Sequence, residues 1–208
     1  MSRVNTGFDP VPYPYTEKEN PHVYFSMGTT AENVAKKFNI LREEQQEFAI
    51  SSHNKAHEAQ KNGKLSEEII PIGECKEDGN IRPNSTQEKL DQLKLAFDTK
   101  GTVTAATSSP LTDGAAATII CEENYAKENN LNILGRIVST AVEGCDPDYM
   151  GLGPIGASKK ALMRADLSID KIDIFELNEA FASQSLACIK DLGIDKKKVN
   201  IDGGALAL

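Results

Sequence analysis

From about residue 133 onward, the sequence alternates segments that favour strands with segments that favour helices. β-Branched residues run through 133–144, and an apolar segment follows at 172–177. Residues 156–168 and the segment that begins at 178 have helical periodicity, and a short strand-like segment precedes Asp202. This alternation predicts an α/β layer in the last third of the chain.

The first half of the chain has a different pattern, with two helical segments ahead of a strand and a turn, and it predicts a separate α+β layer. Thr29 and Glu32 have the spacing of a capping box, which predicts a short helix that ends near Asn39. A longer helix with mostly small apolar residues is expected over 42–62, ended by Gly63. Further elements are expected in order along the chain: a strand at 67–72, a turn at 78–80, a helix at 88–97, a strand beginning at 101 and an exposed helix at 121–130.

Charge and cysteine usage narrow the classes of function. The formal net charge is -8, which argues against nucleic acid or an anionic membrane surface as the main partner. The apolar runs are too short to span a bilayer, and the start of the chain shows no apolar segment typical of a secretion signal. The four cysteines are widely spaced and form no CxxC pair, so we expect buried free thiols in a reducing compartment.

The segment FELNEAFASQ carries the strongest chemical signal. Asn178 and Glu179 follow an apolar strand at the point where a helix begins, which is where α/β folds place ligand sites. An Asn side chain there could orient a water or stabilise an oxyanion, and Glu179 could fix a neighbouring group as an acceptor. The alternative is structural, with Asn178 as the cap of a helix that starts at Glu179.

Three further patterns have weaker chemical interpretations. Hydroxyls at 107–109 before a proline could bind a polar ligand or form a plain turn, and there is no GxSxG motif to support a serine hydrolase. The glycine-rich loop at 151–156 lacks the spacing of a phosphate loop. His53 and His57 have metal-binding spacing, but a solvated helix face is the favoured interpretation, so no metal site is predicted.

The paired glycines near the end of the sequence, Gly203 and Gly204, allow the backbone to turn tightly or to approach another element closely. Together with five other segments, this ending resembles the thiolase family of acetyl-CoA acyltransferases and acetyltransferases. The six segments are MSRV (1–4), SMGTTAENVAKKFNILREEQQEFA (26–49), GTVTAATSSPLTDGAAA (101–117), MGLGPIGASKKAL (150–162), IDIFELNEAFASQ (172–184) and VNIDGGALAL (199–208).

The resemblance implies a fold class and a domain organisation. The class is α/β, with part of the layered thiolase core and an inserted α+β loop domain. Residues 1–110 would form the loop domain that covers coenzyme A, 111–132 the last segment of the N-terminal domain, and 133–208 the first part of the C-terminal domain. Family members are homodimers or homotetramers that act on coenzyme A thioesters in fatty acid metabolism without a covalently bound cofactor. We expect a cytoplasmic location, with mitochondria and peroxisomes as the alternatives.

The resemblance also implies roles for individual residues. Asn178 would hold the water that completes an oxyanion hole for the thioester oxygen. Ser109 would contact the pantetheine arm of coenzyme A, and Arg82 would lie near its nucleotide end. The residues implied to line the acyl-pantetheine channel are Met27, Phe97, Met150 and Ala180.

Thiolase chemistry also needs a nucleophilic Cys, a His that activates it and a second Cys that moves the α-proton of the substrate. The resemblance places all three outside these 208 residues, so the chain resembles an internal fragment of a thiolase. We therefore expect the polypeptide of residues 1–208 to be inactive by itself. The alternative is a non-catalytic acyl-CoA-binding module, or one subunit of a split thiolase.

Overall fold

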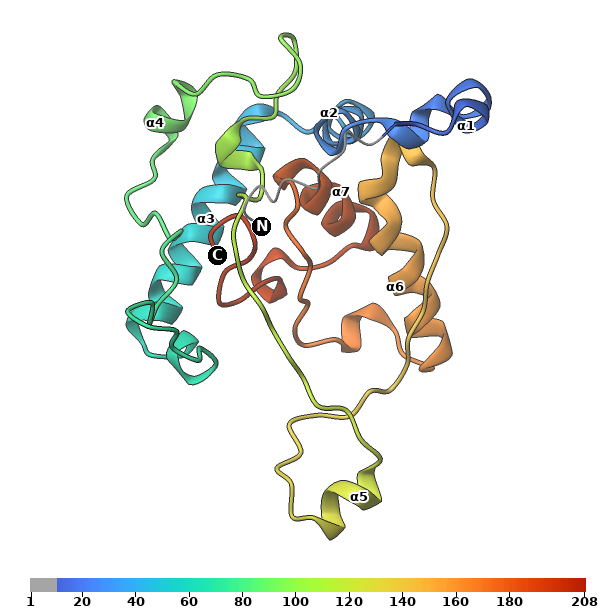
Figure 1. Cartoon of the computed structure of the whole chain (residues 1–208). Coiled ribbons are helices and arrows are strands. Elements are labelled where there is room, and N and C mark those ends of the chain that lie inside the picture. The colour runs from blue at the N-terminus through green and yellow to red at the C-terminus, as the bar shows by residue number, and fades with distance from the viewer. Residues whose placement is uncertain (1–10) are drawn as a thin grey trace.

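The computed structural model describes residues 11–208, so the first of the six motifs, MSRV, lies outside the described residues. Helices supply most of the regular structure in the described part of the chain (Figure 1). The α-helices are α1 (Pro14–Glu19), α2 (Met27–Phe38), α3 (Arg42–Lys61), α4 (Gln87–Asp91), α5 (Glu123–Glu128), α6 (Gly153–Arg164) and α7 (Ala182–Leu192). Short 3₁₀ helices are η1 (Pro21–Tyr24), η2 (Leu65–Glu67), η3 (Ala105–Thr107), η4 (Pro147–Leu152), η5 (Ile169–Lys171) and η6 (Lys196–Lys198).

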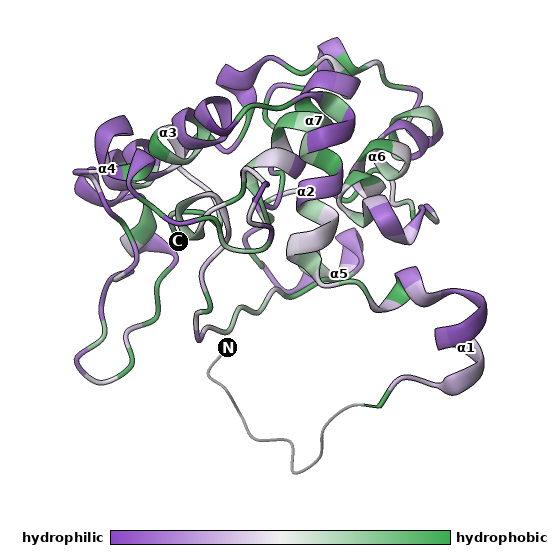
Figure 2. Ribbon diagram, turned by 90° about the horizontal axis from the view of Figure 1, so that it is seen from above, coloured by the Kyte–Doolittle hydropathy of each residue, from purple (hydrophilic) through white to green (hydrophobic). Residues whose placement is uncertain are grey.

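The core lies where α2, α3 and α7 meet. Helix α7 is buried along most of its length, and both α2 and α3 pack against it. Val34 of α2 and Leu186 of α7 belong to one apolar cluster, while Ala49 of α3 packs with the C-terminal Leu206. The small residues of α3 allow this close approach, as the sequence predicts. In Figure 2 hydrophobic positions are prominent along α7, whereas α1 at the edge of the molecule is mostly hydrophilic.

The start of α2 corrects the predicted capping box. The helix begins at Met27, and the hydroxyl of Ser26 accepts the Thr29 N–H at 3.1 Å, so Ser26 is the cap. Glu32 then lies beyond the first turn and faces another segment. Its carboxylate accepts the N–H groups of Thr102 and Val103 at 2.9–3.0 Å. Glu32 therefore fastens α2 to the segment after Gly101 instead of closing its own helix.

Helix α4 is shorter than the predicted helix over 88–97. It ends at Asp91, where the guanidinium of Arg42 donates to the carbonyls of Leu90, Asp91 and Leu93 at 3.0, 3.1 and 2.8 Å. Free carbonyls at a helix end need such donors. Arg42 therefore binds the last two carbonyls of α4 and the Leu93 carbonyl just beyond them, which joins this helix end to the start of α3. Helix α3 itself is confirmed, with bounds one residue from the prediction.

The segments predicted as strands do not form ladders within residues 11–208, where the structure has isolated bridges such as the parallel pair Phe175 and Val199. The predictions of strands at 67–72, from 101, at 133–144, at 172–177 and before Asp202 are therefore wrong as strands of a hydrogen-bonded ladder. An extended segment becomes a strand only when a neighbour lies about 4.8 Å away to pair its backbone groups. In Figure 1 the connections 111–122 and 131–146 run out to α5 and back, and Ile119 and Leu134 are 92% and 94% exposed.

The cysteine prediction is only partly correct. All four cysteines are free, but Cys188 alone is buried, and burial raises the pKa of its thiol to about 11. Cys75, Cys121 and Cys145 are exposed, because each lies in or beside a connection that packs against little else. The four free thiols therefore include no CxxC pair that could act as a redox site or bind zinc.

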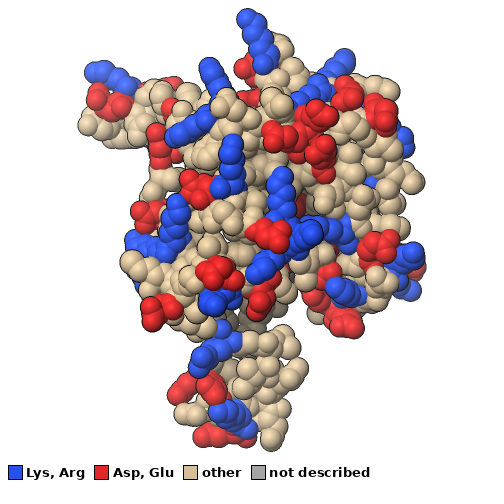
Figure 3. Space-filling view, turned by 180° about the vertical axis from the view of Figure 1, so that it is seen from behind, with Lys and Arg blue, Asp and Glu red and all other residues tan. Residues whose placement is uncertain are grey.

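Surface charge is mixed. In Figure 3 acidic and basic side chains are interspersed over the visible face, without a field of one sign. No helix between residues 11 and 208 is long and apolar enough to cross a bilayer.

Candidate functional site

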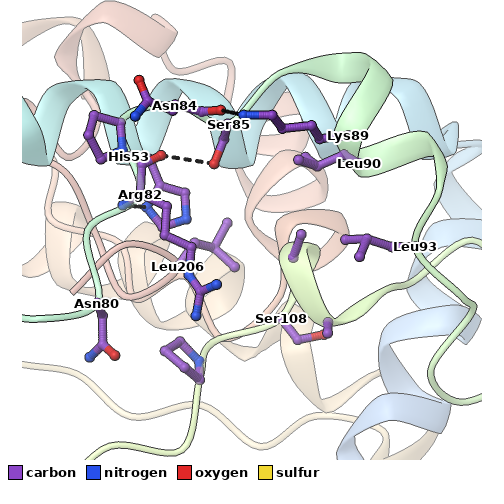
Figure 4. Close-up of a pocket in the computed structure, with 14 residues that line it drawn as sticks. His53, Asn80, Arg82, Asn84, Ser85, Lys89, Leu90, Leu93, Ser108 and Leu206 are labelled. Carbon is purple, nitrogen blue, oxygen red and sulfur yellow. Dashed lines mark hydrogen bonds between the residues drawn. The ribbon is translucent and has the colours of Figure 1, made fainter.

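Two cavities flank the segment that leads into α7. The larger has a volume of about 510 Å³ and lies between α3, the turn at 82–85, α4 and the segment 105–110 (Figure 4). The smaller has a volume of about 210 Å³ and lies between α2, η4 and residues 178–184. An isolated bridge between Ser108 and Phe181 joins their walls, because Ser108 lines the larger cavity and Phe181 the smaller.

The larger cavity combines apolar walls with positive charge. Leu90, Leu93 and Leu206 supply the apolar surface, and its lining includes no carboxylate. Arg82 is exposed, and its guanidinium makes no hydrogen bond or ion pair with the described residues. Lys89 donates to the Asn84 carbonyl at 2.7 Å. Figure 4 shows the Arg82 side chain extending into the space beside Leu206. The cavity can therefore accept an anion that carries an apolar arm.

His53 forms part of this cavity and corrects a prediction. A solvated helix face was expected for His53, but the side chain is 7% exposed, because the turn at 82–85 covers this side of α3. Its Nδ1 accepts the backbone N–H of Arg82 at 3.1 Å. Burial, with a smaller contribution from the Arg82 charge, lowers the pKa of the imidazole below its usual 6.5. His53 is therefore a neutral hydrogen-bond acceptor at neutral pH.

The smaller cavity is mainly apolar, with Met27, Met150 and Phe181 in its lining and two amide side chains, Asn178 and Gln184. Helix α7 begins at Ala182, with Phe181 in the cap position. The capping alternative for Asn178 is therefore wrong: Asn178 lies four residues before the helix, in the loop that forms the cavity wall. An amide in an apolar cavity can orient a water or donate to a developing negative oxygen.

A buried carboxylate next to Asn178 fixes this loop. Glu179 is 1% exposed and accepts three hydrogen bonds, from the Ser52 hydroxyl at 2.6 Å, the Asn200 amide at 2.8 Å and the Leu206 N–H at 3.2 Å. A buried charge is stable only when its lone pairs are satisfied in this way. The prediction that Glu179 fixes neighbouring groups is confirmed.

Asn200 extends the same network to the other side of Asn178. Its Oδ1 accepts the Leu177 N–H, and its Nδ2 donates to the Leu177 carbonyl, both at 2.8 Å. Asn200 has φ 45°, a conformation that Asn adopts more easily than most residues. Residues 177 and 179 are thus both held, which fixes the backbone on either side of Asn178.

The paired glycines make the close approach that the sequence predicts. Gly204 donates its N–H to the Ser52 hydroxyl at 3.1 Å, and a Cβ on Gly204 would overlap the Glu179 carboxylate. Gly203 has φ +93° and lies against the backbone of Ala56. Both glycines are therefore needed to bring the C-terminal turn onto α3 beside the Glu179 network.

Phe97 and Ser109 lie between the cavities and line neither. The Phe97 ring meets Phe181 edge-on, with centroids 5.9 Å apart, and covers Gly28, where a Cβ would overlap the ring. Ser109 donates its N–H to the Ala180 carbonyl at 3.0 Å. The structure therefore brings Met27, Met150, Asn178 and Ala180 together in the smaller cavity and puts Arg82 in the larger one.

Comparison with known proteins decides the family. The model of the thiolase N-terminal domain matches residues 17–124, and that of the thiolase C-terminal domain matches residues 131–208. The first match alone spans more than half of the chain.

The chain belongs to the thiolase family.

Curated thiolases are similar over nearly the whole chain. The 3-ketoacyl-CoA thiolase of Marinobacter nauticus is 49% identical, covering 99% of this chain and 55% of the relative. The acetyl-CoA acetyltransferase of Cupriavidus necator is 48% identical, covering 88% of this chain and 49% of the relative. The names of both relatives denote acyltransferases. The chain spans about half the length of the curated thiolases that it matches.

Solved thiolases confirm the predicted α/β fold class. Human mitochondrial 3-ketoacyl-CoA thiolase in complex with CoA matches with a TM-score of 0.87 and 42% identity, covering 91% of this chain and 49% of that one. The acetyl-CoA acetyltransferase of Bacillus anthracis matches with a TM-score of 0.84. The structure described here is thus a part of the thiolase fold. The domain boundaries at 110 and 132 stay predictions.

Several residues that line the two cavities were not predicted from the sequence. Lys89 looked like an ordinary exposed helix position, and Gln184 was only one letter of the FASQ motif. His53 was considered with His57 as a pair, although only His53 lines the larger cavity. The spacing of the two histidines drew attention to His53. Its hydrogen-bond partner, the Arg82 N–H, is 29 residues away in the sequence and could not be predicted from that spacing.

Proposed function

We propose that this chain contributes the coenzyme A site and the oxyanion-binding amide of an acyltransferase that moves an acyl group between coenzyme A and acetyl-CoA. The larger cavity takes the phosphate-bearing part of the thioester. The smaller cavity takes the acyl end of the pantetheine arm. The reaction class is 3-ketoacyl-CoA thiolysis or its reverse, the formation of a 3-ketoacyl-CoA such as acetoacetyl-CoA.

The observation that carries this proposal is the Arg82 guanidinium, which has no partner among the described residues, in a cavity without acidic lining. In a chain of net charge -8, such a local excess of positive charge favours an anionic ligand. Leu90 and Leu93 offer apolar surface to the arm. Support also comes from a related solved thiolase whose structure contains CoA.

In the chemical step, negative charge develops on the thioester oxygen. Asn178 would hold a water that donates to this oxygen, in an apolar cavity where such a bond is stronger than in water. The Glu179 network keeps the peptide segment that carries Asn178 in place, so little reorganisation is needed during the reaction. Ser109 would guide the pantetheine arm past the Ala180 carbonyl that it already contacts.

Replacing Arg82 by alanine should weaken the binding of CoA about tenfold, because one charge-assisted contact with phosphate is lost. Isothermal titration with the wild-type chain and the R82A variant measures this. Arg136, an exposed arginine that lines neither cavity, provides the matched control R136A, which should bind like the wild type. Equal affinity of R82A and R136A would contradict the assignment of Arg82 to the ligand.

We expect the pure polypeptide of residues 1–208 to bind CoA but not to cleave a 3-ketoacyl-CoA. Its own four thiols stand outside the cavities, so none is placed to accept the acyl group. The measurement is the CoA-dependent loss of acetoacetyl-CoA, with a complete thiolase as positive control. Turnover above the buffer rate that persists after a second purification step would refute the expectation.

The alternative is a non-catalytic acyl-CoA-binding module, or one subunit of a split thiolase. Co-purification with a second polypeptide that carries the missing Cys and His would support it. The homodimer or homotetramer and the cellular location implied by the resemblance remain predictions.

A further inference from the structure

We propose that His53 is a proton-sensitive positioning residue that holds Arg82 in place, so that protonation of His53 releases Arg82 and weakens the binding of an anionic ligand in the larger cavity. This inference rests on the proposed function, because it assumes that Arg82 meets the anionic part of a coenzyme A thioester. It adds a regulatory property, a loss of affinity in mildly acidic solution, that depends on a single imidazole.

Within the turn 82–85, the contact with α3 is made through His53, while on either side of the turn Gln60 of α3 donates to the Asp78 carbonyl at 3.2 Å and Gln87 donates to Gln46 of α3. Ser85 closes the turn internally, because its N–H and hydroxyl both donate to the Arg82 carbonyl, at 3.2 and 2.8 Å. Lys89 holds the Asn84 carbonyl from the side of α4. The bond from the Arg82 N–H to His53 Nδ1, at 3.1 Å, is the one that joins the turn to α3 (Figure 4).

Protonation reverses the character of this contact. A neutral imidazole with its hydrogen on Nε2 offers Nδ1 as an acceptor, whereas an imidazolium has donors at both nitrogens. The Arg82 N–H would then face another N–H group, and two positive charges would lie side by side. The bond cannot survive this change, so the start of the Arg82 turn would separate from the helix.

The lining of the larger cavity offers no carboxylate to offset the new charge on His53. From the turn and α4, Arg82 and Lys89 face the same cavity, and both are positive. The segment 105–110 and Leu206 contribute no titratable group to the lining. On α3 itself, the next titratable side chain on this face is His57, one turn further on. The Glu179 carboxylate comes from the segment before α7 and accepts the Ser52 hydroxyl. Burial and Arg82 together lower the pKa of His53, so the neutral form predominates at pH 7.

Because the pKa of His53 is lowered in the folded chain, the affinity for an anion is expected to fall as the pH falls. The unfolded chain takes up a proton on His53 near pH 6.5, whereas the folded chain does so only at a lower pH. The contribution of His53 is therefore fully present above about pH 6.5 and is lost as the pH falls through the lowered pKa. The affinity for an anion should decrease in the same window.

The test compares CoA binding at pH 7.5 and pH 5.0 for three forms of the chain: wild type, H53N and H57N. An Asn at position 53 places Oδ1 where Nδ1 stands and accepts the Arg82 N–H without titrating. Between the two pH values the wild type and H57N should lose about tenfold more affinity than H53N. The phosphate of CoA also takes up a proton near pH 6, but this is common to all three and cancels in the ratio.

Two results would overturn the inference. One is an equal pH dependence of the wild type and H53N. The other is tighter binding by the wild type alone at pH 5.0, which would mean that the imidazolium contacts the ligand directly. The protection factor of the Arg82 amide, which is its intrinsic exchange rate at each pH divided by the observed rate, should fall as His53 is protonated, as measured by NMR without ligand. If CoA fails to bind at pH 7.5, the proposed function fails, and this exchange measurement still decides the role of His53.

Discussion

Replacing Gly203 by alanine is expected to lower the free energy of unfolding by about 3 kcal/mol, combining a strained backbone with a steric overlap. At φ +93° an L-residue other than glycine is strained. A Cβ would also lie 2.5 Å from the Ala56 Cβ and 2.8 Å from the Ala56 backbone nitrogen. Helix α3 cannot move away without breaking the Ser52–Glu179 contact, so the C-terminal turn must separate from it.

Chemical denaturation of G203A measures this loss, and Gly193 supplies a matched control. Gly193 ends α7 at φ +67°, and a Cβ there would meet nothing within 4 Å. G193A should therefore cost only the backbone strain, about 1 kcal/mol. If G203A is no less stable than G193A, the contact between the C-terminal turn and α3 is not as close as described.

Replacing Glu179 by alanine should have a similarly large effect, a loss of about 3 kcal/mol in the free energy of unfolding. The substitution leaves three donors without their acceptor: the Ser52 hydroxyl, the Asn200 amide and the Leu206 N–H. All three lie at a buried position where water cannot easily replace the carboxylate. The loop with Asn178 should lose its fixed conformation in the same variant.

The control for E179A is E47A, which removes an exposed glutamate from α3 and should change stability by no more than about 0.5 kcal/mol. A double-mutant cycle with S52A isolates the contact between the two side chains. Because they share a hydrogen bond at 2.6 Å, their effects should not be additive. Additive effects, or an E179A variant as stable as E47A, would contradict the network.

Local sequence signals predicted the long helices well. Helix α3 was predicted over 42–62 and runs over 42–61, because its small apolar face and the glycine that follows it act within a few residues. The start of α2 was less well predicted. Ser26 and Thr29 are both good caps, and only the tertiary position of Glu32, beside Thr102, shows which of them is used.

Strands and site geometry depended on partners distant in the sequence. The β-branched segment 133–144 has strand propensity, but a ladder requires a neighbouring segment that propensity does not specify. For the site, the residues alone pointed to Asn178 but left it open to a capping role, and Arg82 was identified only through the family resemblance. The hydrogen bond between His53 and Arg82 uses a side-chain acceptor and a backbone N–H donor. Almost every residue has such a backbone donor, so a sequence pattern cannot predict which one His53 binds.

The exposed connections on either side of α5 divide the molecule into parts that should open independently. Amide hydrogens in 114–122 and 132–146 donate no hydrogen bond to the described residues, so they should exchange with solvent almost as fast as in an unfolded chain. Amides of α7 are buried beneath α2 and α3, and their exchange requires the core itself to open. The protein therefore has no single stability: one part opens at almost no cost in free energy, while the part that carries Asn178 opens only with the whole core.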